Sequence, residues 1–199
     1  MTDPGERLGV LGGTFDPPHH GHLVAAADVR RALRLDRVLM VVANVPWQKV
    51  GSRQISPPEQ RLAMVEAAIE GVDGLEASSI ELARGGHSYT VDTLTELRDL
   101  DPSARLFLIL GADAAGGLAT WERADELPRL ATLVLVDRPG LACPPPPPSW
   151  AFERVSIPRL DVSSTDLRRR VAEGRPLAGL TPVGVATAVE RFGLYRGRR

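Results

Sequence analysis

Runs of consecutive apolar residues, each about as long as a β-strand, recur along this chain and are separated by segments with helical spacing. These runs predict strands over residues 7–12, 37–43, 105–111 and 132–136. Residues 152–157 are the last strand candidate, and an alternating segment over 75–82 is ambiguous. A strand that is apolar throughout is typical of a sheet covered by helices on both faces, because neither face meets water. The alternation therefore predicts an α/β fold with a doubly wound parallel sheet of the dinucleotide-binding, Rossmann-like type.

The segments between the predicted strands carry helix-start signals. A first helix is predicted from about Gly21 to Leu33. Ser56 and Glu59 have the spacing of a capping box, in which Ser56 is the N-cap residue. For a later helix that begins near residue 90, an ordinary N-cap at Ser88 or Thr90 is one of two interpretations, the other being a ligand-binding role for the same residues. These helices would connect successive strands of the sheet.

Length and composition fit one domain. The chain has 199 residues, of which 43% are apolar, so it can bury a substantial core. We expect one unit over 1–199, with an α/β core over 7–161 and a small helical part over 162–199. The last helix of that part should follow Thr181 and Pro182, because this pair has the form of a helix start.

Charge and cysteine content exclude several classes of protein. The formal net charge of −1 gives no reason to expect a nucleic-acid or anionic-membrane partner. A lone cysteine, Cys143, rules out a disulfide within the chain and fits a reducing compartment.

The first residues lack the apolar core of a signal peptide, and no segment has the length of a membrane span. We therefore expect a cytoplasmic protein; assembly into a homo-oligomer is left open.

Residues 8–22, the glycine–histidine segment, pass from an apolar run through Gly12 and Gly13 to three histidines at a predicted helix start. Glycine adopts backbone angles that are closed to other residues and lets a ligand approach the main chain. The unpaired N–H groups and the dipole of a helix start favour an anion. Imidazoles at His19 and His22 add further donors. The segment thus predicts a site for a nucleotide phosphate.

Two other interpretations of this segment stay open at this point. A pair of glycines between a strand and a helix can be a tight connection and nothing more. The histidines can also be metal ligands, but the chain has four histidines, one cysteine and no spaced set of further ligands, so no metal site is predicted. The glycines do not extend into a P-loop or a dinucleotide fingerprint. His20 is expected to be a packing or surface residue.

The residues Gly12-Gly13-Thr14-Phe15-Asp16-Pro17, followed by His19-His20-Gly21-His22, resemble the signature of nucleotidyltransferases with an H/T-x-G-H motif. This residue pattern is most similar to that of bacterial nicotinate-mononucleotide adenylyltransferases. The resemblance extends to Val162-Ser163-Ser164-Thr165-Asp166-Leu167-Arg168 near the C-terminus. It implies transfer of AMP from ATP to nicotinate mononucleotide, which forms nicotinate adenine dinucleotide and pyrophosphate in NAD biosynthesis. Mg²⁺ would arrive with the ATP.

The resemblance also implies roles on the ATP side of the site. His19, His22 and Arg168 are the implied catalytic residues, the histidines at the α-phosphate and Arg168 at the β- and γ-phosphates. Hydroxyls at a helix start and a guanidinium in its first turn suit phosphate oxygens on chemical grounds alone. The implied ATP-binding residues are Gly12, Gly13, Thr14, Phe15, His22, Gly111, Asp113, Ser164, Thr165 and Arg168, with Asp113 at the ribose.

A second set of residues is implied for the acceptor. Lys49 would lie near the substrate phosphate, and Trp121 would stack on the pyridine ring. Amides near Thr90, at a helix start, would bind the nicotinate carboxylate. The implied acceptor-binding residues are Thr14, Lys49, Tyr89, Thr90 and Trp121.

Two rival functions are weighed against this one. The first is another nucleotidyltransferase of the same fold that uses nicotinamide mononucleotide or phosphopantetheine; residues 88–90 and Trp121 argue against it. The second is a nucleotide sensor without turnover, against which the intact His19, His22 and Arg168 argue. Arg61 also matches a position common in the family, and we expect it to be structural.

Overall fold

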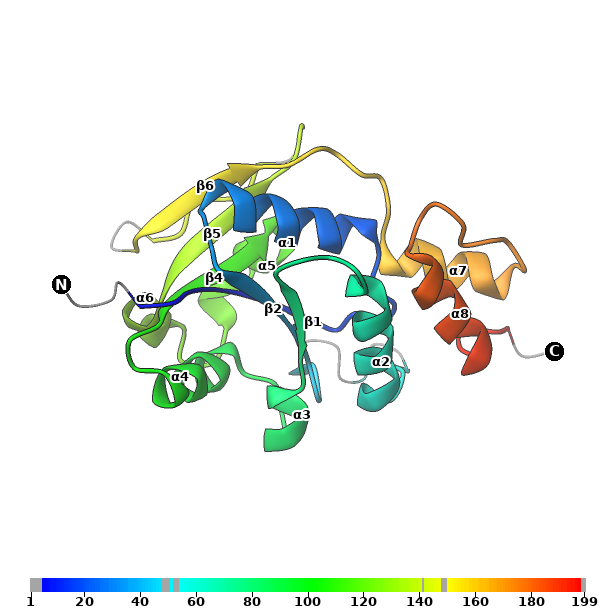
Figure 1. Cartoon of the computed structure of the whole chain (residues 1–199), viewed down its shortest axis with the longest axis horizontal. Coiled ribbons are helices and arrows are strands. Elements are labelled where there is room, and N and C mark those ends of the chain that lie inside the picture. Colours follow the sequence, from blue (N-terminus) through cyan, green and yellow to red (C-terminus); the bar gives the residue numbers. More distant parts are fainter. Residues whose placement is uncertain (1–4, 48–50, 52–53, 141, 148–149, 198–199) are drawn as a thin grey trace.

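The computed structural model describes residues 5–47, 51, 54–140, 142–147 and 150–197. Its centre is a sheet of six parallel strands in the order β3-β2-β1-β4-β5-β6 (Figure 1). The strands are β1 (Arg7–Gly13), β2 (Arg37–Val42), β3 (Leu75–Ser78), β4 (Arg105–Gly111), β5 (Ala131–Asp137) and β6 (Phe152–Ser156). This is the strand order of a doubly wound fold, which reverses between β1 and β4. The predicted fold class is confirmed.

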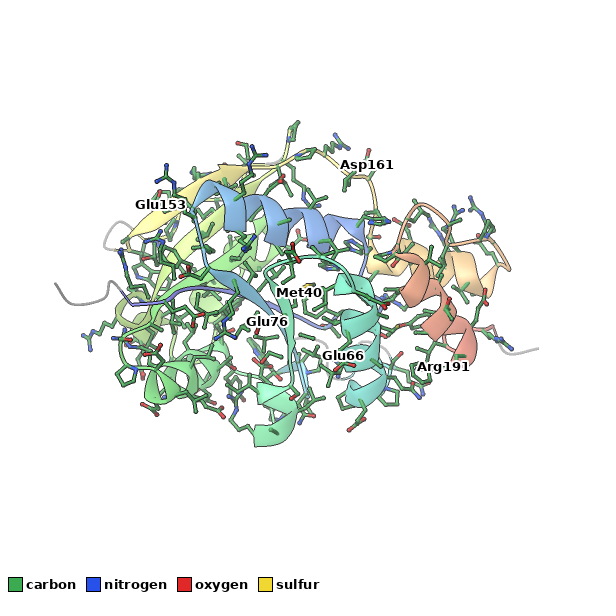
Figure 2. All side chains as sticks on the ribbon, in the orientation of Figure 1. Met40, Glu66, Glu76, Glu153, Asp161 and Arg191 are labelled. Carbon is green, nitrogen blue, oxygen red and sulfur yellow. The ribbon has the colours of Figure 1, made fainter. Side chains whose placement is uncertain are left out.

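The central strands β1, β2, β4 and β5 are largely apolar because alternate side chains enter two separate cores, whereas the edge strands β3 and β6 carry exposed polar residues. On β2, Leu39 and Val41 belong to one core, whereas Val38, Met40 and Val42 belong to the other. Met40 is fully buried, whereas the charged residues labelled with it in Figure 2 are exposed. Burial on both faces gives the four central strands the continuous apolar pattern seen in the sequence.

Helices cover both faces of the sheet (Figure 1). The core on one side holds residues of α1 and α2, and the core on the other side holds residues of α4 and α6. The helices are α1 (His20–Ala32), α2 (Pro58–Ile69), α3 (Ile80–Arg84), α4 (Thr90–Leu100), α5 (Ala112–Gly116), α6 (Leu127–Leu130), α7 (Ser164–Ala172) and α8 (Val183–Arg191); the 3-10 turns are η2 (Leu118–Thr120) and η3 (Ala124–Glu126). In the described part of the chain, no helix is both long enough and apolar enough to cross a membrane.

The C-terminal helices α7 and α8 form a third core together with α2. Leu167 of α7 and Val185 and Val189 of α8 are buried in it beside Met64 and Ala68 of α2. Both helices therefore lie at one end of the molecule, next to α2 (Figure 1). This packing places the start of α7 beside the loop that follows β1.

Two predicted helix starts are wrong in detail. The N-cap of α2 is Pro57 and not Ser56, whose carbonyl instead accepts a hydrogen bond from Nε of Arg61 at 2.8 Å. The N-cap of α4 is Tyr89, because the Ser88 hydroxyl accepts the N–H of Asn44 at 2.8 Å. The Ser56 hydroxyl is hydrogen-bonded to Tyr195, and the Ser88 hydroxyl to Asn44, so a tertiary contact engages each hydroxyl that a local cap would have used. The ambiguous segment 75–82 contains β3 and the first residues of α3.

Candidate active site

A cavity of about 560 Å³ opens at the carboxyl ends of β1, β4 and β5. This is the crevice where the strand order reverses and where ligands bind in doubly wound sheets. Its walls contain most of the residues implied by the resemblance, namely Gly12, Gly13, Thr14, Phe15, His22, Tyr89, Thr90, Gly111, Asp113, Trp121, Ser164, Thr165 and Arg168. His19 is not part of the wall, and Lys49 lies outside the described residues. Segments far apart in the sequence thus meet in one cavity.

Gly12 and Gly13 do not adopt the left-handed backbone angles expected from the sequence, and only Gly13 is required for its small size. Gly12 and Gly13 end β1 and pair with Val41 and Val42 of β2. A Cβ on Gly13 would lie 2.8 Å from the ring of Phe15, so the ring packs where a side chain would be. The left-handed angle is adopted by Phe15, with φ at 49°. This turn reverses the chain below the cavity and buries the Phe15 ring.

His19 and His22 form one unit at the start of α1. His19 is the N-cap residue, and its N–H donates to Nδ1 of His22 at 3.1 Å. The two rings are stacked, with centroids 3.7 Å apart, and the Phe15 ring meets His22 edge-on. A Cβ on Gly21 would lie 3.0 Å from Nδ1 of His19, so a glycine at this position lets the ring sit against the helix. His19 therefore supports His22 from behind.

The charge state of His19 follows from its burial. The side chain is 6% exposed, and this burial, with the positive charge of Arg138, lowers the pKa of His19 to about 4. His19 is therefore neutral near pH 7. Because Nδ1 of His22 accepts a hydrogen bond, Nε2 carries the proton when that ring is neutral.

Residues from the start of α7 are bonded to the loop after β1. The Arg168 guanidinium donates to the carbonyl of Asp16 at 2.8 Å and to the Thr165 hydroxyl at 3.0 Å. The Ser164 hydroxyl donates to the carbonyl of Pro17 at 2.8 Å. Arg168 is the fifth residue of α7 and so lies in its second turn, not in the first as expected. These contacts bring the two predicted phosphate motifs together at one end of the cavity.

The other end of the cavity is formed by two loops that are tied together. The side chain of Asn44 donates to the Gly86 carbonyl at 3.0 Å, and the N–H of Ser88 donates to the Val45 carbonyl at 3.0 Å. These bonds hold the loop after β2 against the start of α4. The first amides of α4 have no partner within the helix, so they suit an anionic group.

Aromatic rings line the same end. The rings of Trp47 and Tyr89 lie 6.4 Å apart, and Trp121 also faces the cavity. The Nε1 atom of Trp121 is buried and has no hydrogen-bond acceptor among the described residues. A flat ring between such side chains would gain apolar contact and a fixed orientation. This end therefore suits an aromatic group that carries a negative charge.

Glu81 and Arg138 line the cavity as well, and the sequence analysis missed both. The Glu81 carboxylate is buried and accepts hydrogen bonds from Thr93, at 2.6 Å, and from Ser88. Burial raises the pKa of Glu81. Glu81 thus ties α3 to the start of α4, a contact that local sequence does not reveal. Arg138 follows the carboxyl end of β5. This position in the sequence could have indicated that Arg138 lines the site.

Arg61 is structural, as expected. It is 1% exposed and donates to backbone carbonyls of Ser56, Thr14, Ala43 and Asn44 at 2.6–3.0 Å. Thr14 follows β1, and Ala43 and Asn44 follow β2. Arg61 therefore joins the ends of two strands below the cavity, where carbonyl groups would otherwise be buried without donors.

The acidic residues of the described chain do not gather into a metal centre: no group of three or more His, Cys, Asp or Glu side chains there is arranged to hold a metal ion. Asp113 and Glu122 are among the carboxylates at the cavity wall. The site as a whole combines anion donors at one end with aromatic rings and helix-start amides at the other. It can hold a nucleotide phosphate chain and a flat, charged ring at the same time.

Known proteins match the chain over nearly its whole length. Residues 10–170 match the cytidylyltransferase-like family. A probable nicotinate-nucleotide adenylyltransferase of Roseiflexus sp. (strain RS-1) is 48% identical over 95% of this chain and 98% of its own. A probable nicotinate-nucleotide adenylyltransferase of Thermus thermophilus is 44% identical over 96% of this chain and 100% of its own.

Solved structures show the same fold. Nicotinic acid mononucleotide adenylyltransferase of Plasmodium falciparum, complexed with NaAD, has a TM-score of 0.80 at 15% identity, with 96% of this chain and 97% of that chain covered. A putative nicotinate-nucleotide adenylyltransferase of Vibrio parahaemolyticus has a TM-score of 0.69 at 21% identity, with 97% of both chains covered. With the sequence matches, the family resemblance is confirmed: this chain belongs to the nicotinate-nucleotide adenylyltransferases of the cytidylyltransferase-like family.

Proposed function

We propose that this protein transfers AMP from ATP to nicotinate mononucleotide, and so forms nicotinate adenine dinucleotide and pyrophosphate in NAD biosynthesis. The observation that carries the proposal is the single cavity in which the glycine–histidine segment, the start of α7 and the start of α4 meet. The names of the relatives support the same reaction.

On the ATP side, the proposed chemistry needs positioning and neutralisation of charge. The phosphate of nicotinate mononucleotide attacks the α-phosphorus in line, and pyrophosphate leaves. His22 donates to the α-phosphate from Nε2, because its Nδ1 is held by His19. Arg168, Ser164 and Thr165 bind the β- and γ-phosphates. Mg²⁺ enters with ATP and neutralises phosphate charge there.

On the acceptor side, recognition uses the ring and its carboxylate. Trp121 stacks on the pyridine ring, and the amides at the start of α4 bind the carboxylate. Tyr89 and Thr90 place these amides, and Glu81 holds the segment that carries them. Lys49 keeps its predicted place near the substrate phosphate as part of the proposal. Cytoplasmic location and homo-oligomeric assembly stay predictions from the sequence.

The rival functions differ from this proposal in acceptor or in turnover. A transferase for phosphopantetheine would not need aromatic rings beside helix-start amides, because its substrate has no aromatic ring that carries a carboxylate. A nucleotide sensor would bind ATP and release no pyrophosphate. Both differences can be measured in one assay.

The test is pyrophosphate release from ATP and Mg²⁺ with nicotinate mononucleotide, nicotinamide mononucleotide or phosphopantetheine in separate reactions. Mass spectrometry of the product should show nicotinate adenine dinucleotide in the first reaction, formed in a 1:1 ratio with pyrophosphate. The matched control is the His22→Ala protein. Efficient turnover of phosphopantetheine, or ATP binding with no turnover of any acceptor, would contradict the proposal.

A further inference from the structure

The loop between β1 and α1 is held by the C-terminal part of the chain. Residues 16–20, which are the end of this loop and the first residue of α1, make hydrogen bonds with α7 and with the segments just before and just after α8. The hydrogen bonds run from Arg168 Nη1 to Asp16 O (2.8 Å), from Ser164 Oγ to Pro17 O (2.8 Å), from Thr181 Oγ1 to Pro18 O (2.8 Å), from His20 N to Leu180 O (3.3 Å) and from Tyr195 Oη to Asp16 Oδ1 (2.6 Å). The loop that precedes the histidines is therefore fixed from one side.

The contact between Tyr195 and Asp16 differs from the others because it holds a buried carboxylate. Asp16 is 1% exposed, and a carboxylate in such a place needs donors to replace water. The Tyr195 hydroxyl donates to it at 2.6 Å, a length typical of a strong bond to a charged acceptor. Burial and the charge of Asp16 raise the pKa of Tyr195, so the phenol keeps its proton at any working pH.

The chain beyond α8 is shaped to deliver this hydroxyl. The N–H of Leu194 donates to the carbonyl of Val189 at 3.0 Å and closes the end of the helix. Tyr195 then adopts a left-handed angle, with φ at 59°, which is strained for a residue with a side chain. Its ring packs on the third core, formed by α2, α7 and α8. The strain is tolerated because packing and the hydrogen bond to Asp16 hold the residue in place.

Asp16 links this contact to the phosphate end of the cavity. Its side chain accepts from Tyr195, while its backbone carbonyl accepts from the guanidinium of Arg168. A shift of Asp16 would therefore move the carbonyl that orients Arg168. Such an effect needs no contact between Tyr195 and the nucleotide.

We propose that Tyr195 is a positioning residue of the ATP site: through Asp16 it fixes the carbonyl that aims Arg168 at the phosphates. This inference rests on the proposed function for the identity of the nucleotide. It adds a role for the segment after α8, to which the sequence analysis assigned no function.

The test compares Tyr195→Phe with Phe192→Leu. The first variant keeps the ring and removes the hydroxyl, and the second alters packing in the same core without touching Asp16. ATP binding is measured by calorimetry without acceptor, and kcat and both KM values are measured separately. We expect Tyr195→Phe to bind ATP about tenfold more weakly, as loss of a bond to a buried charge transmitted to one phosphate ligand would do. Its KM for nicotinate mononucleotide should be unchanged.

A double-mutant cycle tests whether the effect passes through Arg168. In an Arg168→Ala background, Tyr195→Phe should weaken ATP binding less than twofold, because the residue it positions is gone. Equal effects in both backgrounds would overturn the proposal, and so would normal ATP binding by Tyr195→Phe or an equal loss in Phe192→Leu. If the wild-type protein binds ATP but turns over no acceptor, the proposed function fails, while the binding comparison still decides the role of Tyr195.

Discussion

The backbone N–H of His19 donates to Nδ1 of His22, and the two imidazoles stack with centroids 3.7 Å apart. The two histidines of the motif therefore have different roles. His22 lines the cavity, whereas His19 is buried behind it and is neutral near pH 7. Each task leads to its own prediction.

Replacing His22 with alanine should lower kcat by about a hundredfold or more, because it removes a preorganised donor to the α-phosphate. The KM for ATP should change much less. Steady-state kinetics with pyrophosphate detection measures both, and circular dichroism checks the fold. A folded variant with nearly normal kcat would exclude this role for His22.

Arg168→Lys should weaken the use of ATP by about tenfold or more in kcat/KM although it keeps the positive charge. The Arg168 guanidinium donates to the Asp16 carbonyl and, in the proposed complex, would donate to phosphate oxygens at the same time, whereas an ammonium cannot reproduce that planar fork. The matched control is Arg169→Lys on the exposed face of α7, which should behave like the wild-type protein. Unchanged ATP kinetics in Arg168→Lys would place this residue outside the phosphate site.

The buried His19 should make stability depend on pH between about 4 and 6.5. The folded protein lowers the pKa of His19, so the unfolded chain binds the proton more readily in this window. Its contribution is therefore fully present above pH 6.5 and is lost as pH falls toward 4. The loss approaches about 3 kcal/mol of unfolding free energy.

Denaturant titrations of the wild-type protein and of His19→Asn at several pH values measure this effect. The difference in unfolding free energy between the two proteins should shrink as pH falls, because asparagine does not titrate. A difference that stays constant from pH 7 to pH 4 would show that His19 is not held neutral by the fold.

Acceptor choice should favour the acid over the amide by at least about tenfold in kcat/KM. The amides at the start of α4 donate to a carboxylate, whereas the NH₂ group of a carboxamide would face these N–H donors. Trp121→Ala should depress the use of both acceptors alike, since stacking does not depend on the ring substituent. Equal turnover of acid and amide by the wild-type protein would refute the assigned role of residues 88–90.

The sheet and most of the cavity wall could be predicted from the sequence because their signals are local. Strands such as β4 are apolar throughout, and the motif residues follow strand ends directly. The wrong details have physical causes that the local pattern does not display. The hydroxyls of Ser56 and Ser88 are bonded to Tyr195 and Asn44, which are far away in the sequence. The left-handed angle is adopted by Phe15, because Gly12 and Gly13 pair with β2 as part of β1. No local pattern reveals such contacts.

Glu81 and Arg138 were missed for a related reason. Glu81 lies in a segment whose alternating pattern did not distinguish strand from helix, so its orientation toward the cavity was open. The link from Tyr195 to Asp16 joins residues 179 positions apart. Pairings of this range depend on how helices pack and not on the residues between them.

These long-range hydrogen bonds also determine how late in the synthesis of the chain the site can be completed. The glycine–histidine segment leaves the ribosome early, whereas the donors to residues 16–18 are 147 to 179 positions further along. Chains are made at about 5–20 residues per second, so roughly ten to forty seconds pass before Tyr195 is added. During this time β1, β2 and β3 can pair, but the donors to residues 16–18 are missing. On the proposed function, we expect a fragment that ends before α7 to bind ATP more weakly than the whole chain.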